Sequence, residues 1–576
     1  MLRNRALFLG RRYLSSSLAM KSNISLRRSA IQRVPIPTSM EIRLTEQESQ
    51  ICDLLNGCTQ YLEDDKQTTT TCRIAGGWVR DKLLGQDSND IDIALADMMG
   101  QTFAKHLSEY AQDKGIEVGK ITEIPQNPEQ SKHLETATLT LCGLSIDLVN
   151  LRSEEYAENS RIPTGVAFGT PLEDAKRRDI TINALFYNVH NKQVEDFTEQ
   201  GLDDLRDGVI RTPLPPLETF KDDPLRVLRC IRFASRLGYT LVSELTDAAQ
   251  DPAIQDALVS KISRERVGVE VDKMMQGRDP LRSIELFHEL NLFDAIFFSA
   301  IPENVSATFS TKKFDPDRGL ASSVVLNSIT EGIHAEIPTP HPIYLKHLQV
   351  DQSARPRLFL ASALTPYYGA SFKDKKGKEH PGVEAVVRES LKLGVQNHYL
   401  DGIPALFMSV EPVRQLLGEY LTFPAEKVRS SIGLALRNKV IHSPNAGIHW
   451  SESVLFSMIT ELGALYNVSG DSFQLEKASA VLAKYNRLAE QIADLDLYDV
   501  GEAVPLLNGK EIMKAMNKTR GGPWLSVVQL HIMQWQLDNP TASAEDCRVW
   551  LEEEKVAGRL PQATSPEPPS KKVRVK

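Results

Sequence analysis

The spacing of hydrophobic and polar positions in the first third of the chain predicts a sheet with accompanying helices. Short apolar or alternating runs, typical of strands, occur at residues 72–75, 90–95, 137–151 (two strands around a Cys-Gly turn) and 184–197 (a hairpin that turns at 191–192). Helices are predicted at 78–85, where a glycine ends the helix, and at 103–112, which has one apolar face. The pattern indicates an α+β domain with a small mixed or antiparallel sheet.

The pattern changes after this domain. From about residue 218 onward the apolar positions recur at helical spacing, with breaks at 298–319, 373–382 and 438–447. No repeat of fixed length is present. We therefore expect an α+β head followed by an all-helical neck, body and tail. The predicted units are a terminal segment (1–40), head (41–205), neck (206–280), body (281–400), tail (401–553) and a second terminal segment (554–576).

Composition narrows the class of protein. The chain has 576 residues, 41% hydrophobic and 25% charged, which is ordinary for a globular protein of several domains. No stretch approaches the roughly 18–20 apolar residues of a membrane-spanning helix, so no membrane association is expected. The net charge of -9 argues by itself against nucleic-acid binding, although a local basic surface matters more. The six cysteines form no C-x-x-C pair, so reduced thiols are expected.

Both ends of the chain differ from the rest. Residues 1–40 are rich in Arg and Ser and contain no Asp or Glu, which is typical of a mitochondrial transit peptide; a disordered basic tail is the alternative. Met20 and Met40 offer alternative starts that would shorten or remove this signal. Residues 554–576 end in a Pro-rich run and the basic sequence PSKKVRVK. We expect a disordered tail that carries a nuclear-localisation signal, or one that only aids solubility.

Three aspartates suggest a metal site. Asp90 and Asp92 lie two residues apart in a predicted strand and therefore share a face. Like charges so close repel one another, and a divalent cation such as Mg²⁺ would relieve the repulsion. Asp147 lies in an apolar strand, where a buried carboxylate needs a partner. If the sheet places it beside the other two, the three complete a site for two-metal phosphoryl transfer. The alternative is a solvated strand face.

The residues before this strand suggest a cradle for phosphate. Gly76 and Gly77 lack a Cβ, so the backbone there can approach a triphosphate and offer its N–H groups. Arg80 follows at the start of the next predicted helix, where its charge suits a phosphate. The glycines and Arg80 are therefore predicted to bind nucleotide.

The order of these motifs resembles a known family. Gly-Gly-x-x-Arg-Asp followed by Asp-x-Asp is similar to the head of the class II tRNA nucleotidyltransferases of the polymerase β superfamily, which comprise CCA-adding enzymes and bacterial poly(A) polymerases. The other segments that resemble family motifs follow in the family's order at 176–185 (KRRDITINAL), 196–205 (DFTEQGLDDL), 222–234 (DDPLRVLRCIRFA), 263–270 (SRERVGVE), 506–517 (LLNGKEIMKAMN) and 521–525 (GGPWL). Residues 280–500 match only in helical character. The resemblance points to the eukaryotic, fungal type.

The resemblance assigns the segment 176–185 to ribose selection. It implies that Arg177 and Arg178, which are fully charged, contact phosphate. Asp179 and Asn183 can each hydrogen-bond a sugar hydroxyl, and the family uses this motif to distinguish ribose from deoxyribose. A pair of surface arginines is the alternative.

The resemblance assigns the segment 222–234 to reading of the incoming base. We expect one helical face to carry Asp222, Asp223, Arg226, Arg229 and Arg232. Cytosine and adenine present an amino donor beside an accepting ring nitrogen, which complements an acceptor-only Asp and a donor-only Arg. Asp223 and Arg226 would therefore accept CTP and ATP and reject UTP and GTP, while Arg229 and Arg232 would clamp the triphosphate or support the base-reading pair. Asp222 and Asp147 stand where relatives often have Glu.

The resemblance implies template-independent addition of CCA to the 3′ end of tRNA. Asp90 and Asp92 would hold Mg²⁺, Asp147 would help activate the attacking 3′-hydroxyl, and the helical body and tail would grip the tRNA. A monomer or weak dimer is expected, located in mitochondrion, nucleus and cytoplasm according to the start used. The alternatives are a poly(A) polymerase, an enzyme that adds only CC or only A, and a catalytically inactive RNA-binding protein.

Overall fold

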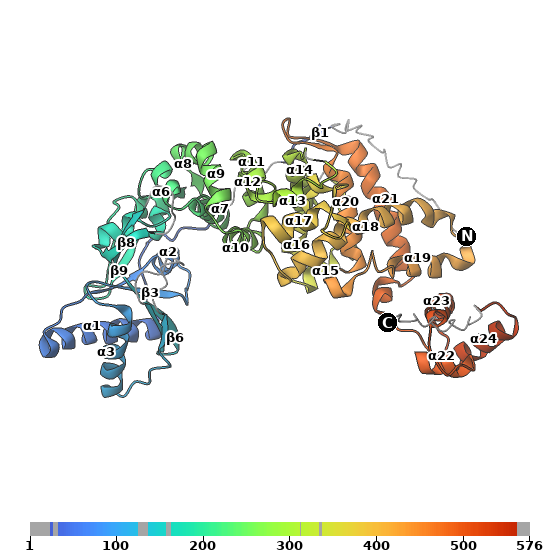
Figure 1. Ribbon diagram of the computed structural model, residues 1–576, viewed down its shortest axis with the longest axis horizontal. Coiled ribbons are helices and arrows are strands. Elements are labelled where there is room, and N and C mark those ends of the chain that lie inside the picture. The colour runs from blue at the N-terminus through green and yellow to red at the C-terminus, as the bar shows by residue number, and fades with distance from the viewer. Residues whose placement is uncertain are drawn as a thin grey trace, which may run out of the picture.

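The chain folds into an elongated arch. The computed structural model describes residues 23–26, 33–124, 136–156, 163–311, 313–332 and 337–560. The head lies at one end of the arch, the helical neck and body form its middle, and the last three helices form the other end (Figure 1). Among the described residues, no helix has both the length and the apolar character needed to cross a membrane.

A seven-stranded mixed sheet forms the centre of the head. In spatial order its strands are β10 (Gln193–Glu195), β9 (Phe186–Asn188), β2 (Cys72–Ala75), β3 (Ile91–Leu95), β6 (Leu144–Asn150), β5 (Thr136–Leu141) and β4 (Thr122–Ile124). Only β3 and β6 run parallel; the other neighbours are antiparallel. The predicted mixed sheet is confirmed. A separate hairpin pairs β7 (Arg152–Tyr156) with β8 (Pro163–Phe168).

Five helices belong to the head: α1 (Glu46–Lys66), α2 (Gly77–Leu83), α3 (Gly100–Asp113), α4 (Pro171–Lys176) and α5 (Gly201–Asp207). α1 and α3 pack on each other, and α3 lies against β5 and β6. α2 follows β2 directly, and the buried Trp78 anchors it. Trp78 Nε1 donates to the buried carboxylate of Glu48, which also accepts from Lys82. These contacts fix the turn between β2 and α2, where the predicted phosphate cradle lies.

Helices make up most of the remaining described chain, as predicted. The neck contains α6 (Pro216–Asp222), α7 (Leu225–Leu237), α8 (Ser243–Ala249), α9 (Pro252–Ser260) and α10 (Arg264–Met275). The body and tail contain α11 (Pro280–Glu289), α12 (Phe293–Phe297), α13 (Glu303–Ser306), α14 (Pro316–Glu331), α15 (Lys346–Val350), α16 (Ala354–Ala363), α17 (Gly382–Ala385), α18 (Tyr399–Glu419), α19 (Val428–Leu436), α20 (Trp450–Gly463), α21 (Leu475–Asp494), α22 (Gly509–Ala515), α23 (Pro523–Asp538) and α24 (Ala544–Val556).

Short strands interrupt the helices at turns that the periodicity did not resolve. They are β11 (Val209–Ile210) with β12 (Thr240–Leu241), β13 (Ser371–Lys373) with β14 (Glu379–Pro381), and β15 (Tyr466–Asn467) with β16 (Ser472–Gln474). The β13–β14 hairpin closes through Gly377, whose φ of 77° favours glycine, and through Asp374, which accepts two backbone N–H groups of the turn. Pairs of two or three residues are too short to leave an alternating pattern in the sequence.

The described residues form three hydrophobic clusters, of which a small one in the head contains Ala75, Ala94 and Phe186. The other two lie under the helices. The larger runs from the head through the body and includes Met533 and Leu537 of α23. The smaller lies between α22, α23 and α24 and contains Ile512, Val528 and Leu551. α23 therefore contributes side chains to both clusters.

The N-terminal segment differs from its prediction as a disordered unit. Residues 23–26 and 33–40 lie against the folded chain, and Asn23–Ile24 form strand β1, which pairs antiparallel with β16. Leu26 and Val34 are buried because these apolar side chains, spaced among basic residues, pack on the main core. Residues 1–22 and 561–576, which hold most of the predicted transit peptide and the basic C-terminal sequence, lie outside the described residues.

Candidate active site

The sheet brings the three predicted carboxylates together. Asp92 in β3 pairs in parallel register with Asp147 in β6, and Asp90 directly precedes β3. One carboxylate oxygen from each lies within 4.8 Å of the others. Asp147 also accepts a hydrogen bond from Thr138 Oγ1 on β5 at 2.5 Å, which fixes its orientation. Oxygen ligands at this spacing suit a hard divalent cation, so the donor set fits the predicted metal.

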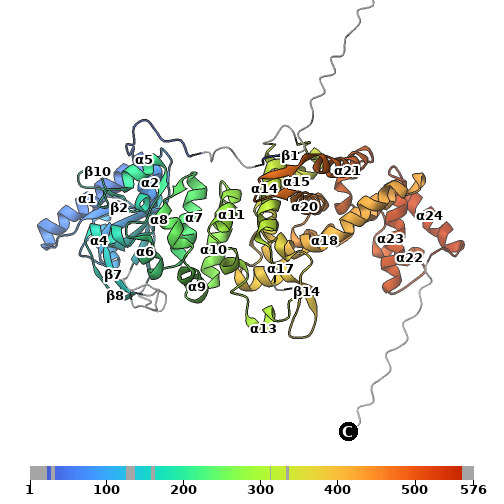
Figure 2. The same cartoon turned by 90° about the horizontal axis from the view of Figure 1, so that it is seen from above.

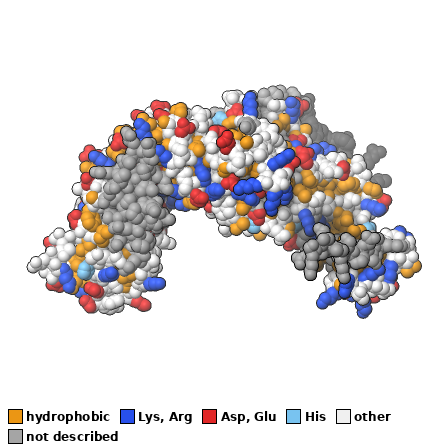
Figure 3. Space-filling view, in the orientation of Figure 1, with side chains coloured by type: hydrophobic (Ala, Val, Ile, Leu, Met, Phe, Trp, Pro, Cys, Tyr) orange, Lys and Arg blue, Asp and Glu red, His pale blue; other side chains and the backbone are white. Residues whose placement is uncertain are grey.

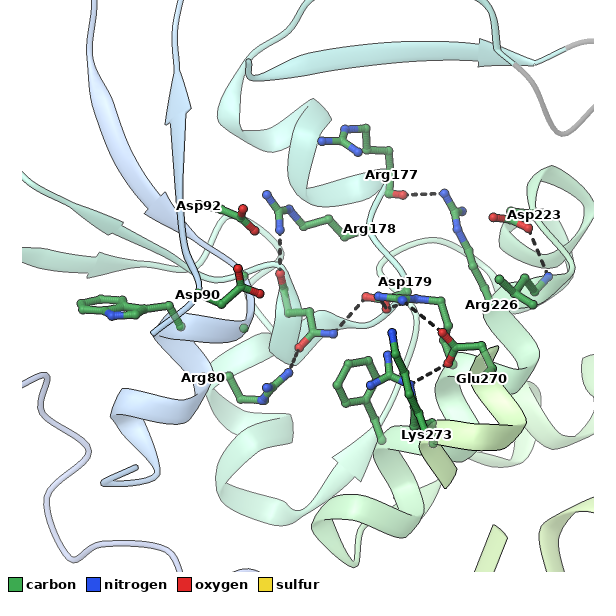
Figure 4. A pocket seen from close by; sticks show the side chains of 18 of the residues that line it. Arg80, Asp90, Asp92, Arg177, Arg178, Asp179, Asp223, Arg226, Glu270 and Lys273 are labelled. Atoms are coloured by element: carbon green, nitrogen blue, oxygen red, sulfur yellow. Dashed lines mark hydrogen bonds and ion pairs between the residues drawn. The ribbon is translucent and has the colours of Figure 1, made fainter. Parts of the chain in front are cut away.

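The electrostatics of this cluster favour a cation. Burial raises the pKa of Asp92 to about 6, and the Asp90 carboxylate adds to the rise, while Arg178 opposes it. Figure 4 shows Asp90 and Asp92 together on one side of the cleft, facing Arg178. A bound cation would stabilise the charged form of all three carboxylates.

The glycine turn is constrained by its neighbours. Gly76 has φ of 76°, and a Cβ there would meet Arg178 Nη1 at 2.9 Å, so a larger residue does not fit. Arg80, which the sequence predicts to bind phosphate, is held by protein partners. It is buried, its Nε donates to Asp81 at 2.8 Å, and Nη1 donates to the side chain of Asn183. Arg80 therefore fixes Asn183 as well as lining the cleft.

Asp174 organises the two arginines of the ribose motif. Arg178 Nε and Nη2 donate to its Oδ2 at 3.1 and 2.9 Å, and Arg177 binds its Oδ1. Arg178 Nη1 also donates to the backbone carbonyl of Asn183 at 3.2 Å. Asp174 was missed in the sequence, although it lies three and four residues before the two arginines, which directly follow α4, and this spacing is a readable signal.

A chain of ion pairs links the ribose motif to α7. Asn183 Nδ2 donates to Asp179 at 3.1 Å, and Asp179 binds Arg229 at 2.7 Å. Glu270 on α10 binds Arg232 at 2.6 Å and lies 3.7 Å from Arg229. Three arginines so close on one helix repel one another unless they meet anions, and Asp179 and Glu270 supply those anions from the protein itself.

The templating segment is not one continuous helix, which corrects the prediction of a single face. α6 ends at Asp222, Asp223 is extended with φ -139° and ψ 97°, and α7 begins at Leu225. The break follows from Pro224, which lacks an N–H and disfavours helical geometry in the residue before it. Asp222 therefore lies on a different helix from the three arginines.

The break leaves Asp223 and Arg226 individually held. Asp223 accepts from Arg266 Nη2 on α10 at 2.8 Å and from the Leu225 N–H at 3.2 Å. Arg226 Nη2 donates to the carbonyl of Arg177 at 2.6 Å, and Nη1 donates to that of Thr219 at 3.3 Å. Arg266 was not singled out in the sequence, because its partner lies 43 residues away.

These groups line one open cleft of about 950 Å³ between head and neck. The predicted residues that line it are Gly76, Gly77, Arg80, Asp90, Asp92, Arg177, Arg178, Asp179, Asn183, Asp223, Arg226, Arg229 and Arg232. Asp147, the register partner of Asp92 on the neighbouring strand, is not among the residues that line the cleft. The lining residues that sequence reasoning missed include Arg236, Arg266 and Lys273. Figure 4 shows the carboxylates at one end and Asp223 with Arg226 at the other.

Comparisons with known proteins identify the family. A family model described as the poly A polymerase head domain matches residues 72–211, and one described as the probable RNA and SrmB-binding site of polymerase A matches residues 253–304. The chain is 37% identical over 551 residues to the mitochondrial CCA tRNA nucleotidyltransferase of Saccharomyces cerevisiae, covering 92% of this chain and 97% of that relative. The chain belongs to the CCA tRNA nucleotidyltransferase family.

Other members of the family agree along the whole chain. A tRNA nucleotidyltransferase of Schizosaccharomyces pombe is 34% identical, covering 88% of this chain and 96% of its own. Among solved structures, an apo CCA-adding enzyme matches 90% of this chain and 97% of its own at a TM-score of 0.57 and 20% identity. A CCA-adding enzyme of Thermotoga maritima in complex with tRNA matches at a TM-score of 0.55 and 19% identity, covering 89% of this chain and 97% of its own. The CCA tRNA nucleotidyltransferase fold thus extends from head to tail.

Proposed function

We propose that this member of the CCA tRNA nucleotidyltransferase family adds cytidylate twice and adenylate once to the 3′ end of tRNA. CTP and ATP are the substrates, pyrophosphate is released, and no nucleic-acid template is used. The observation that carries the proposal is one cleft with Asp90 and Asp92, which form a cluster with Asp147, at one end and Asp223 and Arg226 at the other.

Asp90 and Asp92 would hold Mg²⁺, with Asp147 beside them. A bound divalent metal supplies charge stabilisation for the attacking and leaving oxygens of a phosphoryl transfer. Asp147 pairs with Asp92 in register and lies in the same cluster, so it could accept the proton of the attacking 3′-hydroxyl. Arg178 lies opposite Asp92 and would contact the triphosphate. Asp179 and Asn183 would bind the ribose hydroxyls of the incoming nucleotide.

Asp223 and Arg226 would select the base. The Asp223 carboxylate accepts the exocyclic amino group of cytosine or adenine, and Arg226 donates to the adjacent ring nitrogen. Uracil and guanine place a carbonyl and a ring N–H at these positions, so both contacts become mismatched. Buried polar sites reject such mismatches by as much as about 10⁴–10⁵-fold. The Arg266 ion pair holds Asp223 in one orientation, which this discrimination requires.

The helical part of the arch would bind the tRNA. Figure 3 shows Lys and Arg side chains gathered along the lower edge of the body, beside the hollow of the arch, and at the lower end of the tail. Such local basic surface supports RNA binding despite the net charge of -9. Binding through backbone and shape is usual for double-stranded RNA.

One assay tests the function. A tRNA that lacks its terminal CCA is incubated with each nucleoside triphosphate singly and in pairs, and the extended ends are sequenced. We expect CC with CTP alone and CCA with CTP and ATP. A long A tail would favour a poly(A) polymerase, and arrest after CC, or addition of A alone, would favour a partial enzyme.

Two variants separate the roles of the two ends of the cleft. The double variant Asp90→Ala, Asp92→Ala should bind tRNA and extend nothing. Arg226→Ala should blur the choice of C and A over U and G more than it weakens tRNA binding. Extension by the double variant would refute the metal assignment. Binding of tRNA without any extension by the unaltered protein would favour the inactive RNA-binding alternative.

We also propose mitochondrial location for the form that starts at Met1, because relatives from Saccharomyces cerevisiae and Candida glabrata are named mitochondrial. Proteins that start at Met20 or Met40 would supply the enzyme of the nucleus and the cytoplasm. To test this assignment, proteins are made that can start at only one of the three methionines, because the other two are substituted. Imaging then shows where each protein is located. Equal distribution of all three would contradict it.

A further inference from the structure

An N-terminal arm connects the body to the neck. We define the arm as the described residues 23–26 and 33–34. At one end β1 extends the β15–β16 hairpin of the body, and at the other end residues 33–34 lie against the neck. Figure 2 shows β1 beside α14 and α21, far from the head. The arm therefore joins two parts of the molecule that are far apart in sequence.

The body end of the arm is anchored on Asp471. Its carboxylate accepts the Leu26 N–H at 3.2 Å and the Ser25 hydroxyl, and also the Tyr466 hydroxyl at 2.8 Å. Leu26 is 3% exposed and belongs to the main core. A buried side chain and paired backbone make this a built contact rather than a surface coincidence.

The neck end of the arm caps α7, the helix that carries Arg226. The Val34 N–H donates to the carbonyl of Leu237, the last residue of α7, at 2.9 Å. The last four carbonyls of a helix lack partners within it, so an external donor there stabilises the end. Val34 is 8% exposed, which keeps this hydrogen bond away from water.

Arg33 adds a second contact at the same place. Its Nη2 donates to the carbonyl of Arg206 in α5 at 2.9 Å, and its guanidinium lies over the Tyr239 ring at 5.5 Å. A Cβ at Gly208 would meet this guanidinium at 2.4 Å, so the glycine leaves the space that it occupies. A cation at the carboxyl end of α5 is electrostatically favourable.

We propose that the arm positions the base-selecting helix. Residues 33–34 fix the carboxyl end of α7, residues 23–26 are fixed on the body, and the amino end of α7 carries Arg226 next to Asp223. This inference rests on the proposed function, because it assigns base selection to those two residues. A protein that starts at Met20 retains the arm, whereas a protein that starts at Met40 lacks it. The arm is then part of the working enzyme and not only of an import signal.

Hydrogen exchange and nucleotide choice test the proposal on the full chain. The reference is the protein that starts at Met20. It is compared with the protein that starts at Met40 and with the variant Val34→Pro, which removes the backbone N–H of residue 34. The variant Val34→Ile, which keeps this N–H, is the control. Amides of residues 234–241 should exchange about fivefold faster in the Met40 and Val34→Pro proteins, the factor that a typical helix-capping contact represents. Misincorporation of UTP relative to CTP should rise by a similar factor, with Val34→Ile unchanged.

The outcomes separate this inference from the proposed function. Equal exchange of residues 234–241 in the Met20, Met40 and Val34→Pro proteins overturns the capping contact. Faster exchange with unchanged nucleotide choice overturns the positioning role. Failure of the Met20 protein itself to add CCA counts against the proposed function instead, because the exchange measurement does not depend on activity.

Discussion

Glu270 is the carboxylate on which the arginine row of α7 depends, and the variant Glu270→Gln removes its charge while keeping its shape. The side chain is 4% exposed, and its 2.6 Å contact with Arg232, itself 13% exposed, is screened little by water. Arg229 retains Asp179 at 2.7 Å, so only one arginine loses its main partner. A hydrogen bond to a charged group contributes about 1.5–3 kcal/mol, so we expect a loss of about 2 kcal/mol of unfolding free energy.

This loss is measurable as a shift in melting temperature. For a unit of the size of head plus neck, about 2 kcal/mol corresponds to a decrease of about 4–8 °C. Thermal unfolding followed by circular dichroism measures it, with Glu265→Gln as the control, because that substitution neutralises an exposed carboxylate on the same helix. The control should shift by no more than about 1–2 °C. If the two variants have the same melting temperature, the chain of ion pairs does not hold α7 in place.

Three further predictions concern the cleft. Asp147→Asn should lower the single-turnover rate of CCA addition by about 10²–10³-fold while the melting temperature stays the same. Asp147→Glu should recover part of the lost rate. A normal rate in Asp147→Asn would exclude a catalytic role for Asp147. In the metal-free folded state the pKa of Asp92 is about 6, above the ordinary value of 3.8. The folded state therefore keeps this proton to a higher pH than the unfolded state does, and its stability falls as the pH rises between these two values. Mg²⁺ should therefore raise the melting temperature more at about pH 7.5 than at about pH 5.5, and an equal rise at both would contradict the assignment. Arg266→Ala should lower the preference for CTP over UTP by about fivefold, because its partly exposed ion pair with Asp223 contributes about 1 kcal/mol; competition between the two nucleotides measures it, and an unchanged preference would show that Asp223 needs no support.

The head and its metal end follow from local sequence rules. Alternation in residues 90–95 was enough to place Asp90 and Asp92 on one face, because a strand shows its faces with a period of two. The position of Asp147 beside them depended on how the sheet pairs, and the parallel register of β3 and β6 provides it. The division into a mixed-sheet head and a helical remainder also follows from periodicity alone. These features depend on neighbours in sequence or on the simplest pairing of strands.

The supports of the site depend on contacts that no local pattern records. Arg266 reaches Asp223, and Glu270 reaches Arg232, only because α10 packs against α7. The break at Pro224 was readable, since proline disfavours helical geometry before it, but the regular spacing of the arginines favoured one helix. The arm was hidden because its basic composition is also that of an import signal, while two buried side chains decide its structure.

The division of the hydrophobic interior has a consequence for how the family can vary. α22 and α24 face a small interior of their own, and α23 alone reaches the large one through Met533 and Leu537. A substitution or a change of length within residues 506–560 is therefore absorbed inside a module that joins the rest through a single helix. That end of the arch can therefore change while the distance between the carboxylates and the Asp223 and Arg226 side chains stays the same.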